Sequence, residues 1–373
     1  MKAIKGPRVS VITKDRIIKA IIVILTIYVF LLSIKLLGHS FKLFGKGFAE
    51  AMIQMTSNPF AGLIIGIVAT SLIQSSSTTT SIVVGLVAGG ALSLNNAIPI
   101  IMGANIGTTI TNTLVSMGHI SNRVEFRRAF SASVVHDFFN ICAVIVIFPI
   151  ELKFHLIAKV ATALQRGFTG AGGMKFFNPL KFMLEPVINM IDQFFSFLPQ
   201  KHIFMLIISL VMLFLALTFL IKTIRSLVLA KIEVVINQYL FRNDFLGFFL
   251  GILMTSIVQS SSVTTSLIIP LAGAGLISIR QIFPYTLGAN IGTTVTAILA
   301  AMATQNDVAV TVAFSHLCFN IFGILIFYPL KFIPIKFAEF VGEKASKSTR
   351  NLVSFIIIYI LLHFIPVALI FIK

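Results

Sequence analysis

The sequence predicts an all-α polytopic membrane protein with two inverted-topology repeats. Hydrophobic residues make up 57% of the 373 residues and charged residues only 11%, whereas soluble globular chains carry about 25% charged residues. The apolar runs are long and unbroken, unlike the short alternating strands of a transmembrane β-barrel. A polar motif also recurs at matching positions in the two halves of the chain. These observations exclude a soluble fold, and they assign the net charge of +17 to membrane topology rather than to nucleic-acid binding.

The apolar runs give the expected order of membrane spans. Crossing the hydrocarbon core takes roughly 20 helical residues, and an amphipathic stretch at 41–55 follows the first run. The expected spans are residues 17–37, 97–116, 129–150, 203–221, 281–302, 308–330 and 352–372.

Two further apolar segments, 60–90 and 245–275, carry polar runs in their middle. Each polar run leaves apolar arms of roughly 13 residues, which are too short to cross the membrane singly. A re-entrant helical hairpin with its polar tip at mid-membrane fits this pattern better than a straight span.

Basic residues set the expected orientation. Short loops rich in Lys and Arg face the cytoplasm, which predicts a cytoplasmic N-terminus and cytoplasmic segments at 123–128 and 331–350. The loop at 303–307 has no basic residue and is expected outside. The predicted organisation is a first repeat (1–150), an external connector (151–201), a second repeat (202–330), and a cytoplasmic loop with a final span (331–373).

The duplication has a constant offset of 185 residues. Gln74-Ser75-Ser76-Ser77 recurs as Gln259-Ser260-Ser261-Ser262, and the Gly-Ala-Asn-Ile-Gly-Thr-Thr motif at 103–109 recurs at 288–294. The expected topology places an odd number of crossings between the copies, so the repeats are inverted. This pattern is typical of secondary transporters, whose substrate site lies at the repeat interface. The glycine-flanked motifs predict an interrupted transmembrane helix in each copy.

The repeated motifs bring neutral oxygen atoms into the membrane. Segment 70–113 has no charged residue, and segment 255–298 has only Arg280. Hydroxyl, amide and carbonyl oxygens suit a small hard cation such as Na⁺, while serine hydroxyls and helix N-termini suit an oxyanion. Small polar residues also serve interhelical packing, but an eight-residue polar run present in both halves favours a binding site.

Two ionisable residues, His136 and Asp137, are expected inside one span. Intramembrane ionisable groups are functional candidates by default. His136 recurs as His316, whereas Asp137 is replaced by Leu317 in the second copy. A structural pair and a role in proton or cation transfer both remain open.

The duplicated motifs resemble the type II sodium–phosphate cotransporters, as do Glu125-Phe126-Arg127-Arg128 and the Val135–Asn140 segment. The resemblance implies Na⁺-driven uptake of inorganic phosphate across the cell membrane, with phosphate held between the two hairpin tips. The phosphate-site candidates are Ser75, Ser76, Ser77, Ser260, Ser261, Asn105 and Asn290. The Na⁺-site candidates are Gln74, Gln259, Ser262, Thr108, Thr109, Thr293 and Thr294.

Three other functions remain as alternatives. Hydroxyl and N–H donors also recognise other small oxyanions, such as sulfate or a carboxylate. An ion channel could use the same oxygens in a filter, although channels usually build the filter by oligomeric symmetry. A membrane enzyme is the least expected, because the motifs contain no nucleophile–base pair or metal cluster. The two cysteines, Cys142 and Cys318, are expected to be packing residues, and the oligomeric state is left open.

Overall fold

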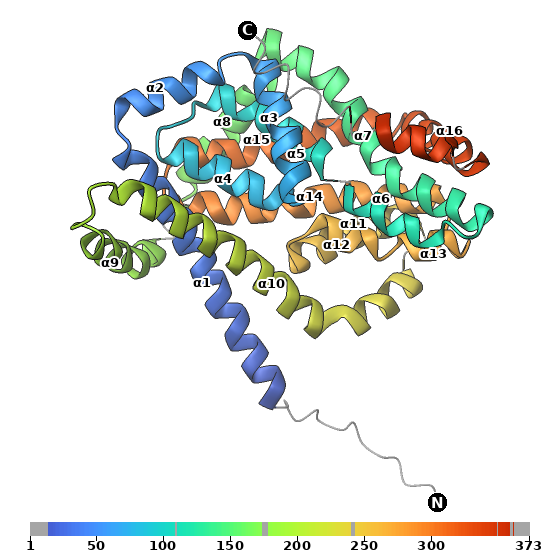
Figure 1. Ribbon diagram of the computed structural model, residues 1–373, viewed down its shortest axis with the longest axis horizontal. Coiled ribbons are helices and arrows are strands. Elements are labelled where there is room, and N and C mark those ends of the chain that lie inside the picture. The colour runs from blue at the N-terminus through green and yellow to red at the C-terminus, as the bar shows by residue number, and fades with distance from the viewer. Residues whose placement is uncertain are drawn as a thin grey trace, which may run out of the picture.

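The computed structural model describes residues 14–108, 110–173, 178–239, 243–348, 350–358 and 361. Every regular element in this part of the chain is a helix, as Figure 1 shows. Helix α4 of the first copy packs against α14 of the second, α6 lies beside α12 and α13, and α1 crosses α10.

The first half contains α1 (Lys14–Leu43), α2 (Lys46–Met55), α3 (Pro59–Ile73), α4 (Ser76–Ala88), α5 (Leu94–Gly107), α6 (Ile110–Ser116), a short 3-10 helix (Met117–His119), α7 (Arg123–Phe154) and α8 (Leu156–Gly170). The second half contains α9 (Asn178–Phe194), α10 (Lys201–Tyr239), α11 (Asp244–Val258), α12 (Ser261–Ser266), α13 (Ile269–Gly273), α14 (Ile279–Thr304), α15 (Asp307–Phe327) and α16 (Phe332–Lys347).

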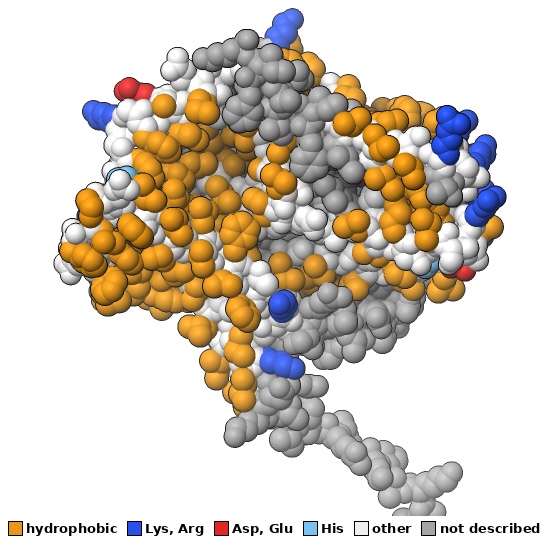
Figure 2. Space-filling view, in the orientation of Figure 1, with side chains coloured by type: hydrophobic (Ala, Val, Ile, Leu, Met, Phe, Trp, Pro, Cys, Tyr) orange, Lys and Arg blue, Asp and Glu red, His pale blue; other side chains and the backbone are white. Residues whose placement is uncertain are grey.

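Six of the seven predicted spans are confirmed as segments that are long and apolar enough to cross a membrane. These segments are Ile17–Leu43, Leu94–His119, Arg123–Phe154, Lys201–Thr223, Ile279–Thr304 and Asp307–Phe327. The seventh, at 352–372, falls largely outside the described residues. Hydrophobic side chains cover much of the surface in Figure 2, and Ile24 of α1 and Phe219 of α10 are among the exposed ones. An apolar surface of this kind fits a multi-pass membrane protein.

Both predicted hairpins are present as helix–turn–helix units. Asn58 caps α3 by accepting from the Phe60 amide at 2.9 Å, and Pro59 occupies the first turn, where its missing N–H costs nothing. In the second copy Asn243 caps α11 by accepting from the Leu246 amide at 2.8 Å. The first arm of each hairpin has 15 residues, which is short for a full crossing.

Glycines let the first arm of each hairpin pack backbone to backbone on the helix that follows the hairpin. A Cβ atom at Gly66 of α3 would collide with the Ile100 carbonyl of α5, and one at Gly251 of α11 with the Tyr285 carbonyl of α14. The two contacts are related by the offset of 185 residues. The reciprocal contacts are Gly103 with the Leu63 carbonyl and Gly288 with the Phe248 carbonyl.

The prediction of an interrupted helix in both copies is wrong for the second copy. In the first copy α5 ends at Gly107 and α6 begins at Ile110, with Thr109 between them outside the described residues. Helix α14 runs without interruption through its own Gly-Ala-Asn-Ile-Gly-Thr-Thr motif. The hydroxyl of Thr293 donates to the carbonyl of Ala289 at 2.9 Å within this helix. The motif glycines of α14 therefore serve close packing on α11, and they do not mark a turn.

The expected loop at 331–350 is mostly helical. Helix α16 packs on α7 at Gly342, where an added Cβ would meet the hydroxyl of Ser131. This contact holds α16 against the basic start of α7.

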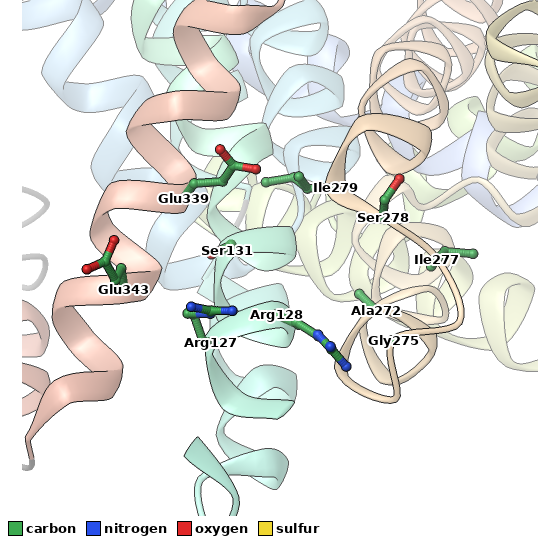
Figure 3. Close-up of a pocket in the computed structure, with 10 residues that line it drawn as sticks. All are labelled: Arg127, Arg128, Ser131, Ala272, Gly275, Ile277, Ser278, Ile279, Glu339 and Glu343. Atoms are coloured by element: carbon green, nitrogen blue, oxygen red, sulfur yellow. The ribbon is translucent and has the colours of Figure 1, made fainter. Parts of the chain in front are cut away.

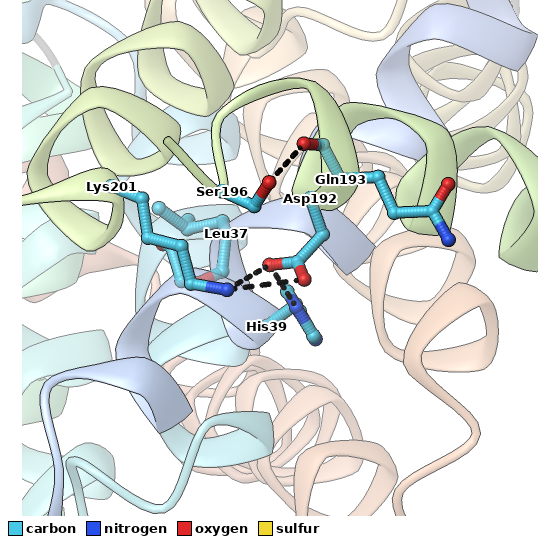
Figure 4. A network of polar contacts seen from close by, with 7 residues as sticks. Leu37, His39, Asp192, Gln193, Ser196 and Lys201 are labelled. Atoms are coloured by element: carbon cyan, nitrogen blue, oxygen red, sulfur yellow. Dashed lines mark hydrogen bonds and ion pairs between the residues drawn. The ribbon is translucent and has the colours of Figure 1, made fainter. Parts of the chain in front are cut away.

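The connector at 151–201 contains α8 and α9. The buried carboxylate of Glu151 accepts from the Ile157 amide at 2.6 Å, and so caps α8. In Figure 4, His39 of α1 and Lys201 of α10 both reach the Asp192 carboxylate of α9, at 3.3 and 3.2 Å. Partial burial raises the pKa of Asp192, but the hydrogen bonds from His39 and Lys201 outweigh it and hold the pKa below its ordinary value. This network ties α9 to the first copy.

Candidate substrate and ion site

The tip of the first hairpin is a tight helix-to-helix turn. Gln74 ends α3 in the left-handed region at φ 56°, with its amide donating to the Thr70 carbonyl at 2.7 Å. Ser75 then caps α4, because its hydroxyl accepts from the Thr78 amide at 3.2 Å. The hydroxyl of Thr70 donates to that of Thr79 at 3.0 Å and joins the two arms.

The tip of the second hairpin repeats this geometry at the same offset. Gln259 ends α11 at φ 60°, with its amide donating to the Thr255 carbonyl at 2.7 Å. Ser260 accepts from the Val263 amide at 3.3 Å. The hydroxyls of Thr255 and Thr264 lie 2.7 Å apart. The duplicated Gln-Ser-Ser-Ser motif thus specifies the same turn in both copies.

The two copies contact each other at these tips. The hydroxyl of Ser77 donates to the backbone carbonyl of Gln259 at 3.4 Å, across the two hairpins. The hydroxyl of Ser262 donates to the backbone carbonyl of Thr108, at the end of α5, at 3.2 Å. Ser76, Ser77, Ser261 and Ser262 are buried. The structure therefore brings together residues that lie about half the chain apart, as the repeat pattern predicts.

Asn105 and Asn290 are buried and held by protein partners from both copies. The Asn290 side-chain oxygen lies 2.5 Å from Nε2 of His136, and the Asn105 oxygen lies 3.2 Å from Nε2 of His316. Each pair joins one copy to the other. The backbone carbonyls of the two asparagines accept from Asn140 and Asn320 at 2.8 and 3.0 Å. His136 thus contacts Asn290 of the other copy, while the choice between a His136–Asp137 pair and a role in proton or cation transfer stays a prediction.

The remaining candidates differ in exposure. Gln259 is buried, and its side-chain oxygen accepts from the Thr296 hydroxyl at 2.6 Å, whereas Gln74 is exposed. Thr108, Thr293 and Thr294 are buried and donate back into their own helices. Thr109 lies outside the described residues.

Several residues near the tips are absent from the sequence-based site. Thr296 binds Gln259, and Asn112 of α6 donates to the Thr265 hydroxyl of α12 at 2.9 Å. Asn140 and Asn320 hold the asparagine carbonyls, and their matching positions in the two copies are the signal that could have identified them.

The tips themselves carry no charge. The residues from Ser75 to Ser81 and from Ser260 to Ser266 are all neutral. Within the described part of the chain, no group of three or more His, Cys, Asp or Glu side chains could hold a metal ion. The available ligands are hydroxyl, amide and carbonyl oxygens, which suit Na⁺, together with hydroxyl and amide donors, which suit an oxyanion.

Comparison with known proteins places this architecture in a family. The chain matches the family model of the Na⁺/Pi-cotransporters over residues 29–176 and 212–338. It is 35% identical to sodium-dependent phosphate transport protein 2A of Ovis aries, over 91% of this chain and 65% of the relative. It is 33% identical to sodium-dependent phosphate transport protein 2B of Homo sapiens, over 90% of this chain and 63% of the relative.

The chain spans slightly less than two thirds of the length of these relatives. No solved structure matches it. Both motif regions and both hairpins lie within the matched residues, so the match covers the whole candidate site. The chain therefore belongs to the Na⁺/Pi-cotransporter family.

Proposed function

We propose that this protein is a secondary active symporter that couples Na⁺ entry to the uptake of inorganic phosphate by alternating access. The observation that carries the proposal is the contact between the two neutral tips, where Ser77 of one hairpin reaches the Gln259 carbonyl of the other. The named relatives are sodium-dependent phosphate transport proteins, which supports both the ion and the substrate.

Phosphate binds between the tips through hydroxyl and backbone N–H donors. The first turn of α4, capped by Ser75, supplies amide donors and the positive end of a helix dipole. The direct ligands in this proposal are Ser75, Ser76, Ser77, Ser260 and Ser261. The side chains of Asn105 and Asn290 are held by His316 and His136. These asparagines therefore join the phosphate site by exchanging partners as the protein changes conformation.

Sodium supplies the charge that the tips lack. An anion held only by neutral donors away from water is costly to bury. A Na⁺ ion about 5 Å away, at an effective dielectric constant near 20, contributes on the order of 3 kcal/mol. The proposed Na⁺ ligands are oxygens of Gln74, Gln259, Ser262, Thr108, Thr109, Thr293 and Thr294. Phosphate and Na⁺ should therefore bind with positive, reciprocal coupling.

The proposal also includes the orientation of the chain in the plasma membrane. The N-terminus, the 123–128 segment and the 331–350 segment are cytoplasmic, while the connector at 151–201 and the 303–307 loop are external. The distribution of Lys and Arg in the short loops supports this orientation. It makes the two repeats inverted relative to each other.

Phosphate binding measured at several Na⁺ concentrations tests the mechanism. In purified protein, raising Na⁺ should lower the phosphate Kd. Ser76→Ala should weaken phosphate binding even at saturating Na⁺, whereas Thr293→Ala should mainly reduce the dependence on Na⁺. Ser209→Ala serves as the control, because Ser209 lies outside the tips and its hydroxyl donates to the Leu206 carbonyl within α10. A phosphate Kd that does not respond to Na⁺ in the parent protein would refute the coupling.

Transport assays test the Na⁺-driven uptake, and cysteine labelling tests the proposed orientation in the membrane. Reconstituted protein should accumulate labelled phosphate only under an inward Na⁺ gradient, and excess unlabelled sulfate should compete poorly. In a background without Cys142 and Cys318, cysteines at the exposed positions Ser121 and Gln200 should react with an impermeant reagent from opposite sides. Labelling of both from one side would disprove the proposed topology.

A further inference from the structure

A cavity of about 470 Å³ lies away from the hairpin tips, between α7, α16 and the loop from α13 to α14. In Figure 3, Arg128 of α7 extends toward the loop at Gly275, and Glu339 extends from α16 toward Ile279 on the other side. Arg127 lies beside Arg128, on the side that faces α16. The cavity is thus bounded by two cations on one side and a carboxylate on the other.

The arginines in this cavity are not neutralised by direct ion pairs. Among the described residues, neither Arg127 nor Arg128 has a carboxylate within ion-pair distance. Glu343, also on the cavity wall, pairs with Lys347 at 2.8 Å. Its pKa lies below the ordinary value because of the hydrogen bond from Lys347 and, more weakly, the charge of Arg127.

A third group in the cavity is the hydroxyl of Ser131. Ser131 of α7 is 6% exposed and lines the cavity beside the arginines. Its hydroxyl has no hydrogen-bond partner among the described residues. The oxygen is not among the enclosed polar atoms without a partner and it lines the cavity, so this hydroxyl is available to a ligand there.

The combination of groups selects a particular anion. Guanidinium groups present planar forks of donors that match the oxygens of phosphate. An ionised carboxylate such as that of Glu339 only accepts hydrogen bonds. Glu339 is exposed to water, but a ligand that brings its own O–H donor as well as negative oxygens can bind all of these groups at once. Hydrogen phosphate has such a P–OH group near neutral pH, and a phosphate monoester has one in its monoanionic form, whereas sulfate has none.

We propose that this cavity is a second binding site, specific for a phosphate group that carries at least one P–OH. Arg127, Arg128 and Ser131 donate to the negative oxygens, and Glu339 accepts from the P–OH. Free phosphate and the headgroup of phosphatidic acid share this chemistry. The site does not depend on the proposed transport function, since none of its residues belongs to the hairpin tips.

Binding of labelled inorganic phosphate in Na⁺-free buffer isolates this site from the Na⁺-dependent one at the tips. The protein is held in phosphatidylcholine nanodiscs, with choline in place of sodium. Arg127→Gln and Arg128→Gln should each weaken this Na⁺-independent binding about tenfold, and Arg128→Lys should weaken it less. Lys153→Gln, at an exposed position of the same helix, should leave it unchanged.

Competition by sulfate tests the role of Glu339. In the parent protein sulfate should displace phosphate poorly from the Na⁺-independent site. Glu339→Gln removes the negative charge and adds an amide donor, so sulfate should then compete about tenfold better. Unchanged melting temperatures of the variants would show that they are folded.

A second experiment, with phosphatidic acid in the nanodiscs, identifies the source of the phosphate group. In nanodiscs that also contain phosphatidic acid, native mass spectrometry should detect retained phosphatidic acid if the headgroup is the ligand, and Arg127→Gln with Arg128→Gln should abolish its retention. Loss of either ligand in the arginine variants supports the site. If neither free phosphate nor phosphatidic acid binds in an arginine-dependent manner, the proposal is overturned, whatever happens to Na⁺-dependent binding at the tips.

Discussion

The tips of the two hairpins have the same turn and nearly the same residues, but they differ in their partners. Gln259 is buried and holds the Thr296 hydroxyl, while Gln74 is exposed, although Thr111 occupies the position that matches Thr296. Since both residues of the pair are present in both copies, this difference is one of conformation. The two copies of a repeated sequence have therefore adopted different local conformations at their tips.

A second difference between the tips comes from a difference in sequence between the two copies. Thr265 pairs with Asn112, but the matching Thr80 would need an asparagine at 297, where the chain has alanine. The buried hydroxyl of Thr80 has no partner among the described residues. This difference cannot be reversed by a conformational change. The two kinds of asymmetry make different predictions.

The largest effect should come from a feature that the copies share. Gly66→Ala and Gly251→Ala each place a Cβ against a carbonyl of the neighbouring helix, and each should cost about 3 kcal/mol or more of stability. Gly118→Ala, where an added Cβ meets nothing within 4 Å, is the control. Melting curves followed by size-exclusion chromatography measure the effect. A harmless change in one copy alone would show that the packing is not equivalent.

The conformational asymmetry predicts unequal effects at the two glutamines. Without Na⁺ and phosphate, Gln259→Ala leaves the Thr296 hydroxyl without its partner and should cost about 2 kcal/mol. Gln74→Ala should cost little, because its side chain is exposed. Thermal unfolding of the two variants under identical conditions compares them. Equal losses would mean that the tips are equivalent in the resting protein.

The sequence asymmetry predicts unequal effects at the two threonines. Thr265→Val removes the bond with Asn112 and should cost about 1 kcal/mol. Thr80→Val replaces an unpaired buried hydroxyl with a methyl group and should be neutral or slightly stabilising. Chemical or thermal denaturation distinguishes the two. A large loss at Thr80 would reveal a partner that forms in another conformation.

The smallest effect concerns the ion pairs outside the tips. Asp192 ties the connector to the first copy, and its pKa is lowered in the folded protein. A lowered pKa means that its contribution to stability is present above the unfolded pKa, near 3.8, and is lost as the pH falls through the folded value. Asp192→Asn should lower the melting temperature slightly at pH 7. The difference from the parent should shrink at progressively acidic pH, and a difference that grows there would contradict this role.

The sequence predicted the features of the fold that depend on local residue patterns. The hairpin arms follow from apolar length, and the turns at Gln74 and Gln259 follow from the polar run and its repetition. The Gly-Ala-Asn-Ile-Gly-Thr-Thr motif led to the wrong prediction of an interruption in α14. Sequence alone does not distinguish a glycine that ends a helix from a glycine that lets a neighbouring backbone pack closely. The pairing of Asn290 with His136 joins residues of different copies, so no periodicity could reveal it. The partners of Gln74 and Gln259 depend on the conformation adopted.

The glycine contacts also determine which parts of the molecule can move. Where α3 meets α5, and α11 meets α14, carbonyl groups lie directly against glycine Cα atoms, so neither helix can slide along the other without a backbone collision. Each pair should therefore travel as one rigid body. Displacement is left to the surfaces between the pairs, which at the tips are bridged by the hydroxyls of Ser77 and Ser262 and by the pair of Asn112 with Thr265. Such bonds can break and re-form within the microseconds to milliseconds of a domain motion, so in the proposed transport cycle the two rigid helix pairs would move relative to each other at the tips.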